Sequence, residues 1–273
     1  MYKNLLDKYK FKPNYIWNCD ETMISLADNK YKVVCRANEG KPCEKKVNFD
    51  EHITLLLSIS ASGLITKPLA IFPLKTCPNL SEDVIKNFNI VGQHNGWITG
   101  NIFKKIIEFS FIPTIQHNRR KSGELDEPVL LIFDNHSSRS YIDAEELWNK
   151  YKIIFLLLPP HSSAILQPLD LSVNGTFKTT LKSLFRFIEN ESRPCTRFRL
   201  MDASYRSLQN ALNPHTIKLG WERSGLWPFN TESLNQNKMI IQQSVQPNLN
   251  QNKKRKRGPD ISNGKILFEG ESL

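Results

Sequence analysis

Residues 129–134 read Val-Leu-Leu-Ile-Phe-Asp, five apolar residues followed directly by a carboxylate. An uninterrupted apolar run of this length is typical of a strand that is covered on both faces of its sheet. A carboxylate at the end of a buried strand is costly to desolvate unless a cation holds it there. We therefore interpret Asp134 as a functional residue. The simpler alternative is that Asp134 and Asn135 only form the turn that leaves the strand.

Two other aspartates stand at the ends of apolar segments. Asp20 closes Tyr-Ile-Trp-Asn-Cys-Asp at 15–20, and Asp170 follows Ile-Leu-Gln-Pro-Leu at 165–169. Carboxylates that converge on one point supply the oxygen ligands that Mg²⁺ prefers. Two such ions can activate the attacking oxygen and stabilise the leaving oxygen of a phosphodiester. The sequence therefore predicts a site for two Mg²⁺ or Mn²⁺ ions at Asp20, Asp134 and Asp170; the alternative for Asp170 is a helix N-cap.

The order of the predicted elements indicates an α/β fold, with helices on both faces of a mixed sheet. We expect strands at 15–22, 52–60, 64–72, 129–133 and 153–158, and helices at 99–112, 143–150 and 170–187. In such sheets active sites gather at the carboxyl ends of strands, which is where Asp20 and Asp134 fall. The chain divides into a lead-in segment (1–14), a folded domain (15–230) and a disordered tail rich in Asn and Gln (231–273).

The composition favours a nucleic-acid partner. The 273 residues carry a formal net charge of +10 at pH 7, which favours binding to a polyanion. The five cysteines include no Cys-x-x-Cys pair, and no apolar run approaches the roughly 18 residues that cross a bilayer. We therefore expect DNA as a partner, no membrane association and a reducing compartment.

A basic run in the tail predicts nuclear localisation or a nucleic-acid patch. It consists of Lys253, Lys254, Arg255, Lys256 and Arg257. The alternative is a tail that only keeps the chain soluble.

Five short motifs follow one another along the chain. They are Asn-Cys-Asp-Glu-Thr at 18–22, His-Ile-Thr-Leu-Leu-Leu-Ser-Ile-Ser-Ala-Ser-Gly at 52–63, Asp-Asn-His-x-Ser at 134–138, Leu-Pro-Pro-His-Ser-Ser-x-x-Leu-Gln-Pro-Leu-Asp at 158–170 and Ser-Gly-Leu-Trp-Pro-Phe-Asn at 224–230. In this order they resemble the DDE-superfamily endonuclease domain of pogo/Tigger/Jerky-type transposases, which are related to Tc1/mariner elements. The resemblance covers roughly residues 10–232. It implies a ribonuclease-H-like fold and a metal-dependent site that cuts and joins DNA strands, with Asp20, Asp134 and Asp170 as the three acidic residues.

Other polar side chains near these motifs are candidates for supporting roles. Those expected to orient a metal ligand or touch a phosphate are Asn135, His136 and His161, whereas Gln167 is expected to hold the loop that carries Asp170. Their alternatives are turn formation, packing and ordinary backbone hydrogen bonds. Arg119, Arg120 and Lys121 either contact phosphate or form an exposed polar connector. The tryptophans in apolar contexts, expected in the core, are Trp17, Trp97, Trp221 and Trp227.

These observations predict a metal-dependent DNA endonuclease and strand transferase derived from a transposase. About 14 residues precede the first predicted strand, which is too few for the helix-turn-helix module of such transposases. We therefore expect recognition of a DNA sequence to need a separate protein, and copies of the chain to assemble on DNA. The alternative is a non-catalytic nuclear DNA-binding protein of the centromere protein B and Jerky kind. A third, weaker option is a nuclease for RNA/DNA hybrids.

Overall fold

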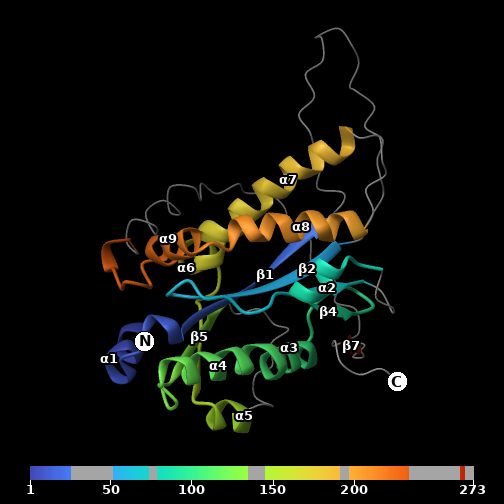
Figure 1. Ribbon diagram of the computed structural model, residues 1–273. Helices are drawn as coiled ribbons and strands as arrows, with labels where there is room; N and C mark the ends of the chain where they lie inside the picture. Colours follow the sequence, from blue (N-terminus) through green and yellow to red (C-terminus); the bar gives the residue numbers. More distant parts are fainter. Residues whose placement is uncertain (26–51, 74–78, 135–144, 191–196, 234–264, 268–273) are drawn as a thin grey trace, which may run out of the picture.

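The computed structural model describes residues 1–25, 52–73, 79–134, 145–190, 197–233 and 265–267 (Figure 1). At the centre of these residues lies a seven-stranded mixed sheet with the order β6-β5-β1-β2-β3-β4-β7. In that order the strands are β6 (Ile153–Leu157), β5 (Val129–Phe133), β1 (Ile16–Ser25), β2 (His52–Ser60), β3 (Leu69–Phe72), β4 (Asn89–Gly92) and β7 (Lys265–Leu267). Helices cover both faces, so the predicted α/β fold with a mixed sheet is confirmed.

The sheet contains both antiparallel and parallel pairs: β1 has one neighbour of each kind, and β3 and β4 form a further parallel pair. β1, β2 and β3 pair in antiparallel fashion, whereas β1, β5 and β6 pair in parallel. The five residues of β5 are fully buried, as expected for a central parallel strand covered on both faces. β1 and β5 run in the same direction, and β1 continues past the end of β5 to Ser25. The prediction that Asp20 lies at the carboxyl end of its strand was therefore wrong, because β1 extends further than its apolar run through pairing with β2.

The two faces are covered by helices from different parts of the chain (Figure 1). One face carries α3 (Gly100–Ile106), the π-helical turn η3 (Ile107–Phe111), α4 (Ile112–Ser122) and α5 (Glu145–Lys150). The other face carries α7 (Asn174–Asn190), α8 (Arg197–Ala211) and α9 (Pro214–Ser224). The remaining elements are α1 (Tyr2–Tyr9), the 3₁₀ turn η1 (Pro13–Tyr15), α2 (Glu82–Asn87), α6 (Ser163–Leu166) and the π-helical turn η5 (Leu169–Val173). Within the described ranges, no helix has the length and apolarity needed to span a bilayer.

Alternation along β1 sends its side chains into two separate cores. Ile16 belongs to the core beneath α7, α8 and α9, whereas Trp17 and Cys19 belong to the core against α3 and α4. Trp17 and Trp221 are fully buried, as predicted. The prediction for Trp97 was wrong: its side chain is 47% exposed and packs on the His52 ring with centroids 4.4 Å apart.

The ends of the chain contain more structure than the sequence predicted. The lead-in segment forms α1, whose Tyr2 hydroxyl donates to the Leu226 carbonyl at 2.6 Å. Part of the predicted disordered tail, Lys265–Leu267, pairs with β4 as an antiparallel strand. The basic run 253–257 lies outside the described residues.

Two predicted elements have different bounds in the structure. Thr99 caps α3 as predicted, since its hydroxyl accepts from the Ile102 N–H at 3.3 Å. The helical path does not end at residue 112 but continues through η3 and α4 to Ser122, so the predicted exposed connector is helical. The strands predicted at 52–60 and 64–72 pair in antiparallel fashion as β2 and β3, but β3 begins only at Leu69.

Candidate active site

The three predicted aspartates lie on segments that meet at the carboxyl end of β5. Asp20 lies within β1 and is buried, Asp134 directly follows β5 and is half-buried, and Asp170 is exposed in η5. The pairing of β1 with β5 matches Ile16 with Leu130 and continues in step to Asn18 and Ile132. Asp20 is two residues beyond Asn18, and Asp134 is two residues beyond Ile132. If the register continued over these two residues, Asp134 would lie opposite Asp20 and on the same face.

The Asn18 side chain ties together the three segments that carry these aspartates. It is fully buried on β1, two residues before Asp20. Its Nδ2 donates to the Ile132 carbonyl of β5 at 3.0 Å, and its Oδ1 accepts from the Leu169 N–H of η5 at 3.1 Å. One amide therefore fixes the distances between β1, β5 and η5 through two long-range hydrogen bonds.

The Asn174 side chain joins two of the carboxylates directly. Its Nδ2 donates to Asp20 Oδ2 at 3.1 Å and to Asp170 Oδ1 at 2.8 Å. Because both bonds start at one nitrogen, the two carboxylate oxygens cannot be farther apart than the sum of these distances. Asp170 and Asn174 are four residues apart on adjoining helical segments, a spacing that brings side chains together.

The turn η5 is held against β1 and α9 by a set of buried contacts. Gln167 Nε2 donates to the Cys19 carbonyl at 3.2 Å, next to Asp20. Ser172 Oγ donates to the Thr216 carbonyl at 2.8 Å. A Cβ on Gly220 of α9 would lie 2.4 Å from the Pro168 carbonyl oxygen, so only glycine permits this approach. Asp170 is thus positioned by helix packing on one side and by β1 on the other.

The donor set around Asp20 and Asp170 suits a hard cation. The carboxylates supply oxygen atoms, and the Asn174 Oδ1 nearby is buried with no hydrogen-bond partner among the described residues. A complete centre is not formed there, because within the described ranges no group of three His, Cys, Asp or Glu side chains is close enough to hold a metal ion. The sharing of metal by all three aspartates therefore stays a prediction.

The other predicted supporting residues have different outcomes. Gln167 is fully buried and donates to the Cys19 carbonyl of β1, a contact that holds the segment carrying Asp170, in agreement with its expected role. His161 is exposed in the turn after β6, with a backbone φ of 61°. Asn135 and His136 lie outside the described residues.

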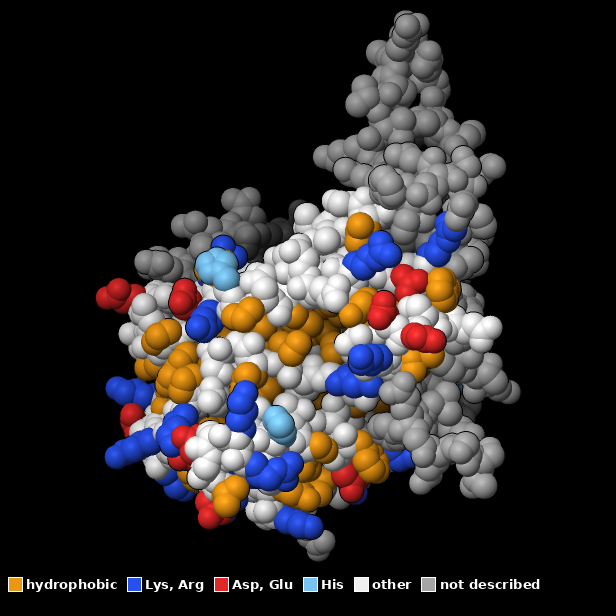
Figure 2. All heavy atoms as spheres, viewed as in Figure 1, with side chains coloured by type: hydrophobic (Ala, Val, Ile, Leu, Met, Phe, Trp, Pro, Cys, Tyr) orange, Lys and Arg blue, Asp and Glu red, His pale blue; other side chains and the backbone are white. Residues whose placement is uncertain are grey.

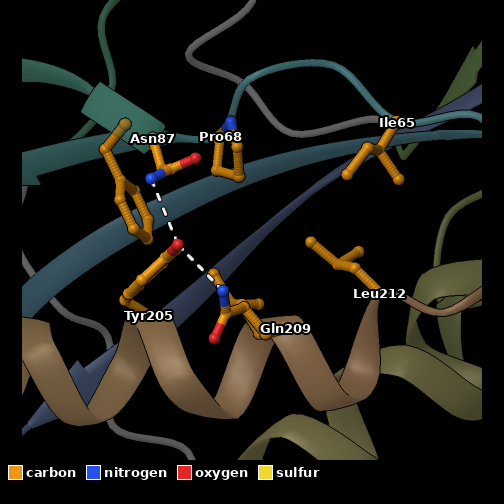
Figure 3. A pocket seen from close by; sticks show the side chains of 8 residues that line it. Ile65, Pro68, Asn87, Tyr205, Gln209 and Leu212 are labelled. Carbon is orange, nitrogen blue, oxygen red and sulfur yellow. Dashed lines mark hydrogen bonds between the residues drawn. The ribbon is translucent and has the colours of Figure 1, made fainter. Parts of the chain in front are cut away.

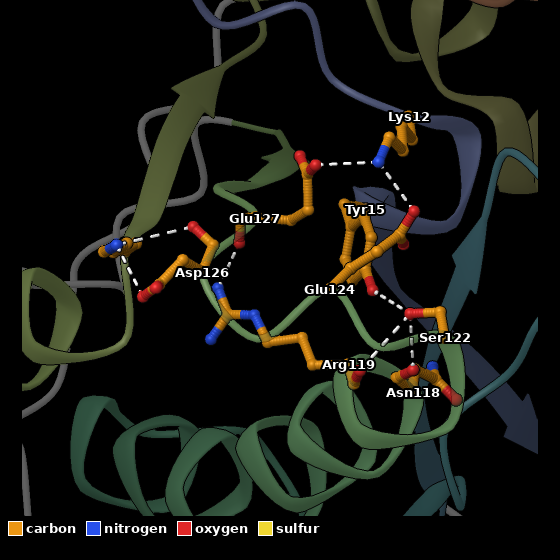
Figure 4. Close-up of polar contacts among 9 residues, drawn as sticks. Lys12, Tyr15, Asn118, Arg119, Ser122, Glu124, Asp126 and Glu127 are labelled. Atoms are coloured by element: carbon orange, nitrogen blue, oxygen red, sulfur yellow. Dashed lines mark hydrogen bonds and ion pairs between the residues drawn. The ribbon is translucent and has the colours of Figure 1, made fainter.

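The prediction that Arg119 contacts phosphate needs correction. Its side chain is 2% exposed, and its guanidinium donates to the backbone carbonyl of Glu127 (Figure 4). It also donates to the backbone carbonyl of Tyr151 at 2.9 Å. These bonds hold the segment before β5, and burial lowers the pKa of Arg119. Arg120 and Lys121 are exposed on α4, where contact with phosphate stays a prediction.

Sequence reasoning missed Asn18 and Asn174 as site residues. For Asn18 a signal existed, since it precedes Asp20 by two residues and so shares its face of a strand. Asn174 follows Asp170 by four residues, which is one helical turn. Neither spacing reveals hydrogen bonds to segments that lie far away in the chain.

A pocket of about 280 Å³ lies apart from the aspartates, between α8 and the residues before β3 (Figure 3). It is mostly apolar, and the Tyr205 hydroxyl accepts from Asn87 Nδ2 at 3.2 Å and from Gln209 Nε2 at 2.8 Å at one side of it. None of the predicted site residues lines this pocket.

Fold and site together define an α/β domain in which Asp20 and Asp170 share the Asn174 amide donor and Asp134 directly follows the parallel strand β5. The chain belongs to the DDE superfamily endonuclease family, which it matches over residues 50–221. That range includes Asp134 and Asp170, and Asp20 precedes it. The predicted DDE-superfamily membership is confirmed, while the pogo/Tigger/Jerky subtype stays a prediction.

One similar protein is described as a transporter and not as an endonuclease. The chain is 27% identical over 232 residues to the MFS-type transporter clz9 of Cochliobolus lunatus. The matched region covers 81% of this chain and 24% of that protein. This chain thus spans about a quarter of that relative.

Two solved structures of Mos1 transposase are also similar. The Mos1 strand transfer complex has a TM-score of 0.48 at 14% identity, over 86% of this chain and 59% of that chain. The Mos1 mariner paired end complex with Mn has a TM-score of 0.43 at 14% identity, over 86% and 60%. At this level of similarity, neither structure assigns a role to a residue of this chain.

Proposed function

We propose that this chain is the catalytic domain of a metal-dependent DNA endonuclease and strand transferase derived from a transposase. The observation that carries the proposal is the Asn18 side chain, which bonds to the backbones of β5 and η5 and so brings the segments of Asp20, Asp134 and Asp170 to one place. Membership of an endonuclease family supports the reaction class. A fold that needed only stability would not require acidic residues at this junction.

In this proposal the three aspartates hold Mg²⁺ or Mn²⁺. When bound, two such ions would activate the attacking oxygen and stabilise the leaving oxygen of the phosphodiester. The chain's own contribution is placement. β1 buries Asp20 and fixes it beside the end of β5, while η5 presents Asp170 to solvent, where a DNA strand has access.

The DNA backbone is expected to follow α7 away from the carboxylates. Lys178 and Lys182 are exposed on α7 and continue the spacing of four residues that relates Asp170 to Asn174. Lysines in this position can neutralise phosphates on either side of the scissile bond. On the face shown in Figure 2, Lys and Arg side chains are spread over several elements with apolar side chains between them. We therefore place the DNA contact along α7 and not across a broad basic surface.

The biological setting is part of the same proposal. Nuclear localisation would depend on the basic run 253–257, which has the composition of a localisation signal. Assembly of copies on DNA and a separate protein for sequence recognition would supply what a catalytic domain alone lacks.

The test is nicking of supercoiled DNA in Mn²⁺ by the wild-type chain and the Asp134→Asn variant. Loss of a metal ligand should exceed the roughly 10–100-fold effect of losing an outer-shell partner, so we expect the nicking rate to fall about 100-fold or more. The matched control is Asp83→Asn, which removes an exposed carboxylate on α2 and should nick at the wild-type rate. Equal nicking by wild type and Asp134→Asn, or none by either, would contradict the proposal.

Two further measurements separate the alternatives. Faster cleavage of an RNA/DNA hybrid than of duplex DNA would indicate the hybrid nuclease. Tight binding to one DNA sequence in EDTA, without any nicking in Mn²⁺, would indicate the non-catalytic DNA-binding protein.

A further inference from the structure

The Asn174 side chain occupies the place between two carboxylates that a cation would otherwise take. Its Nδ2 is the shared donor to Asp20 Oδ2 and Asp170 Oδ1. Asp20 is buried, and two anionic groups held this close repel one another unless positive charge or N–H donors lie between them. The amide NH₂ group provides this compensation in the absence of metal.

The other end of the same amide is left without compensation. Asn174 Oδ1 is buried and has no hydrogen-bond partner among the described residues, although Asn174 is only 5% exposed. A buried polar atom without a partner is rare in folded proteins and calls for a specific explanation. An amide oxygen is also a good ligand for a hard divalent cation.

We propose that Asn174 is an exchangeable amide ligand of the metal site, a proposal that rests on the proposed metal-dependent function. Without metal, its Nδ2 holds Asp20 and Asp170 together in a prearranged pair. A half-turn about the terminal torsion of the side chain, which has a broad two-fold profile, would exchange Nδ2 for Oδ1 at the same place. Oδ1 would then face the divalent cation between the two carboxylates. The structure therefore assigns to one side chain both the stabilisation of the empty site and part of the coordination of the filled one.

The first test measures thermal unfolding in EDTA. Asn174→Asp replaces the donor by a third carboxylate, and Asn174→Leu removes both polar atoms while keeping the branched shape of the side chain, so each should lower the midpoint of unfolding by several degrees. The matched control is Asn210→Asp at an exposed position of α8, where loss of the exposed bond to Thr180 Oγ1 should change the midpoint much less. If both Asn174 variants unfold at the wild-type midpoint, Asn174 does not hold Asp20 and Asp170 together in the metal-free protein.

The second test measures Mn²⁺ binding by calorimetry and by electron paramagnetic resonance, with no DNA present. Added negative charge among the ligands raises affinity for divalent ions, so Asn174→Asp should bind Mn²⁺ about tenfold more tightly than the wild type. Asn174→Leu, which lacks the ligand oxygen, should bind about tenfold more weakly. Binding by Asn174→Leu that equals or exceeds the wild type would show that Asn174 is not a ligand, as would the absence of Mn²⁺ binding by the wild type.

A third test uses only the wild-type chain, so it remains valid if the Asn174 variants fail to fold. The side-chain ¹H–¹⁵N signals of Asn174 should shift on titration with Mg²⁺, because the NH₂ group loses its bonds to two carboxylates. Unchanged signals at saturating Mg²⁺ would overturn the exchange. None of these readouts depends on DNA cleavage, so a chain that binds metal through Asn174 but does not nick DNA would contradict the proposed function alone.

Discussion

The contact between α9 and η5 offers a sharp test of how Asp170 is positioned. In Gly220→Ala, the new Cβ would lie 2.4 Å from the Pro168 carbonyl oxygen and 2.5 Å from Ser172 Oγ. Ordinary contacts of a Cβ atom begin near 3.4 Å. The Ser172 hydroxyl can rotate away, but the Pro168 carbonyl belongs to the backbone, so α9 and η5 must separate by about 1 Å.

The expected cost follows from two opposing terms. Overpacking of this kind costs about 1–3 kcal/mol, and replacing glycine by alanine inside a helix returns about 1 kcal/mol. The net change in the free energy of unfolding is therefore a loss of up to about 2 kcal/mol, or up to about 8 °C in midpoint for a domain of this size. The effect on activity should be larger, because misplacing a reacting group by about 1 Å can cost about 100-fold in rate.

Urea denaturation and the supercoiled-DNA nicking assay measure the two effects on the same protein samples. Gly175→Ala is the matched control, since it lies in α7 with nothing within 4 Å of the added Cβ. It should be at least as stable as the wild type and equally active. If Gly220→Ala matches Gly175→Ala in both stability and nicking rate, the reasoning that α9 positions Asp170 is refuted.

Three further predictions address other parts of the chain. Arg119→Lys should lower the free energy of unfolding in urea by about 1–3 kcal/mol, because an ammonium cannot reach both carbonyls as the guanidinium does; the adjacent, exposed Arg120→Lys should change it by less than about 0.5 kcal/mol. Lys178→Ala should reduce the slope of log affinity for DNA against log salt by about 0.9, whereas Lys86→Ala on exposed α2 should leave it unchanged; equal slopes would remove Lys178 from the DNA contact. Burial lowers the pKa of His52 below its usual 6.5, so the unfolded chain takes up the proton first and stability should fall as the pH drops below about 6.5. His52→Phe should weaken that dependence in unfolding curves measured at several pH values, and an unchanged dependence would exclude His52 as its source.

Much of the fold could be read from local patterns. The apolar run of β5, the Thr99 cap and the strand β2 each depend on residues close together in sequence, and all are present. The extension of the helical path to Ser122 was missed because the polar residues of α4 resemble a connector when only their composition is considered. In the structure their helix is anchored by Arg119, whose buried bonds reach Glu127 and Tyr151.

Local patterns were enough to single out Asp20, Asp134 and Asp170, because a carboxylate next to a buried apolar run is costly to desolvate without a compensating partner. How these carboxylates are held depends on contacts between distant segments. Asn18 and Asn174 are ordinary amides in the sequence, and their roles arise from partners 114 to 154 residues away. Periodicity reports which face a side chain occupies, whereas a hydrogen bond between distant segments requires a register and a helix packing that no local pattern encodes.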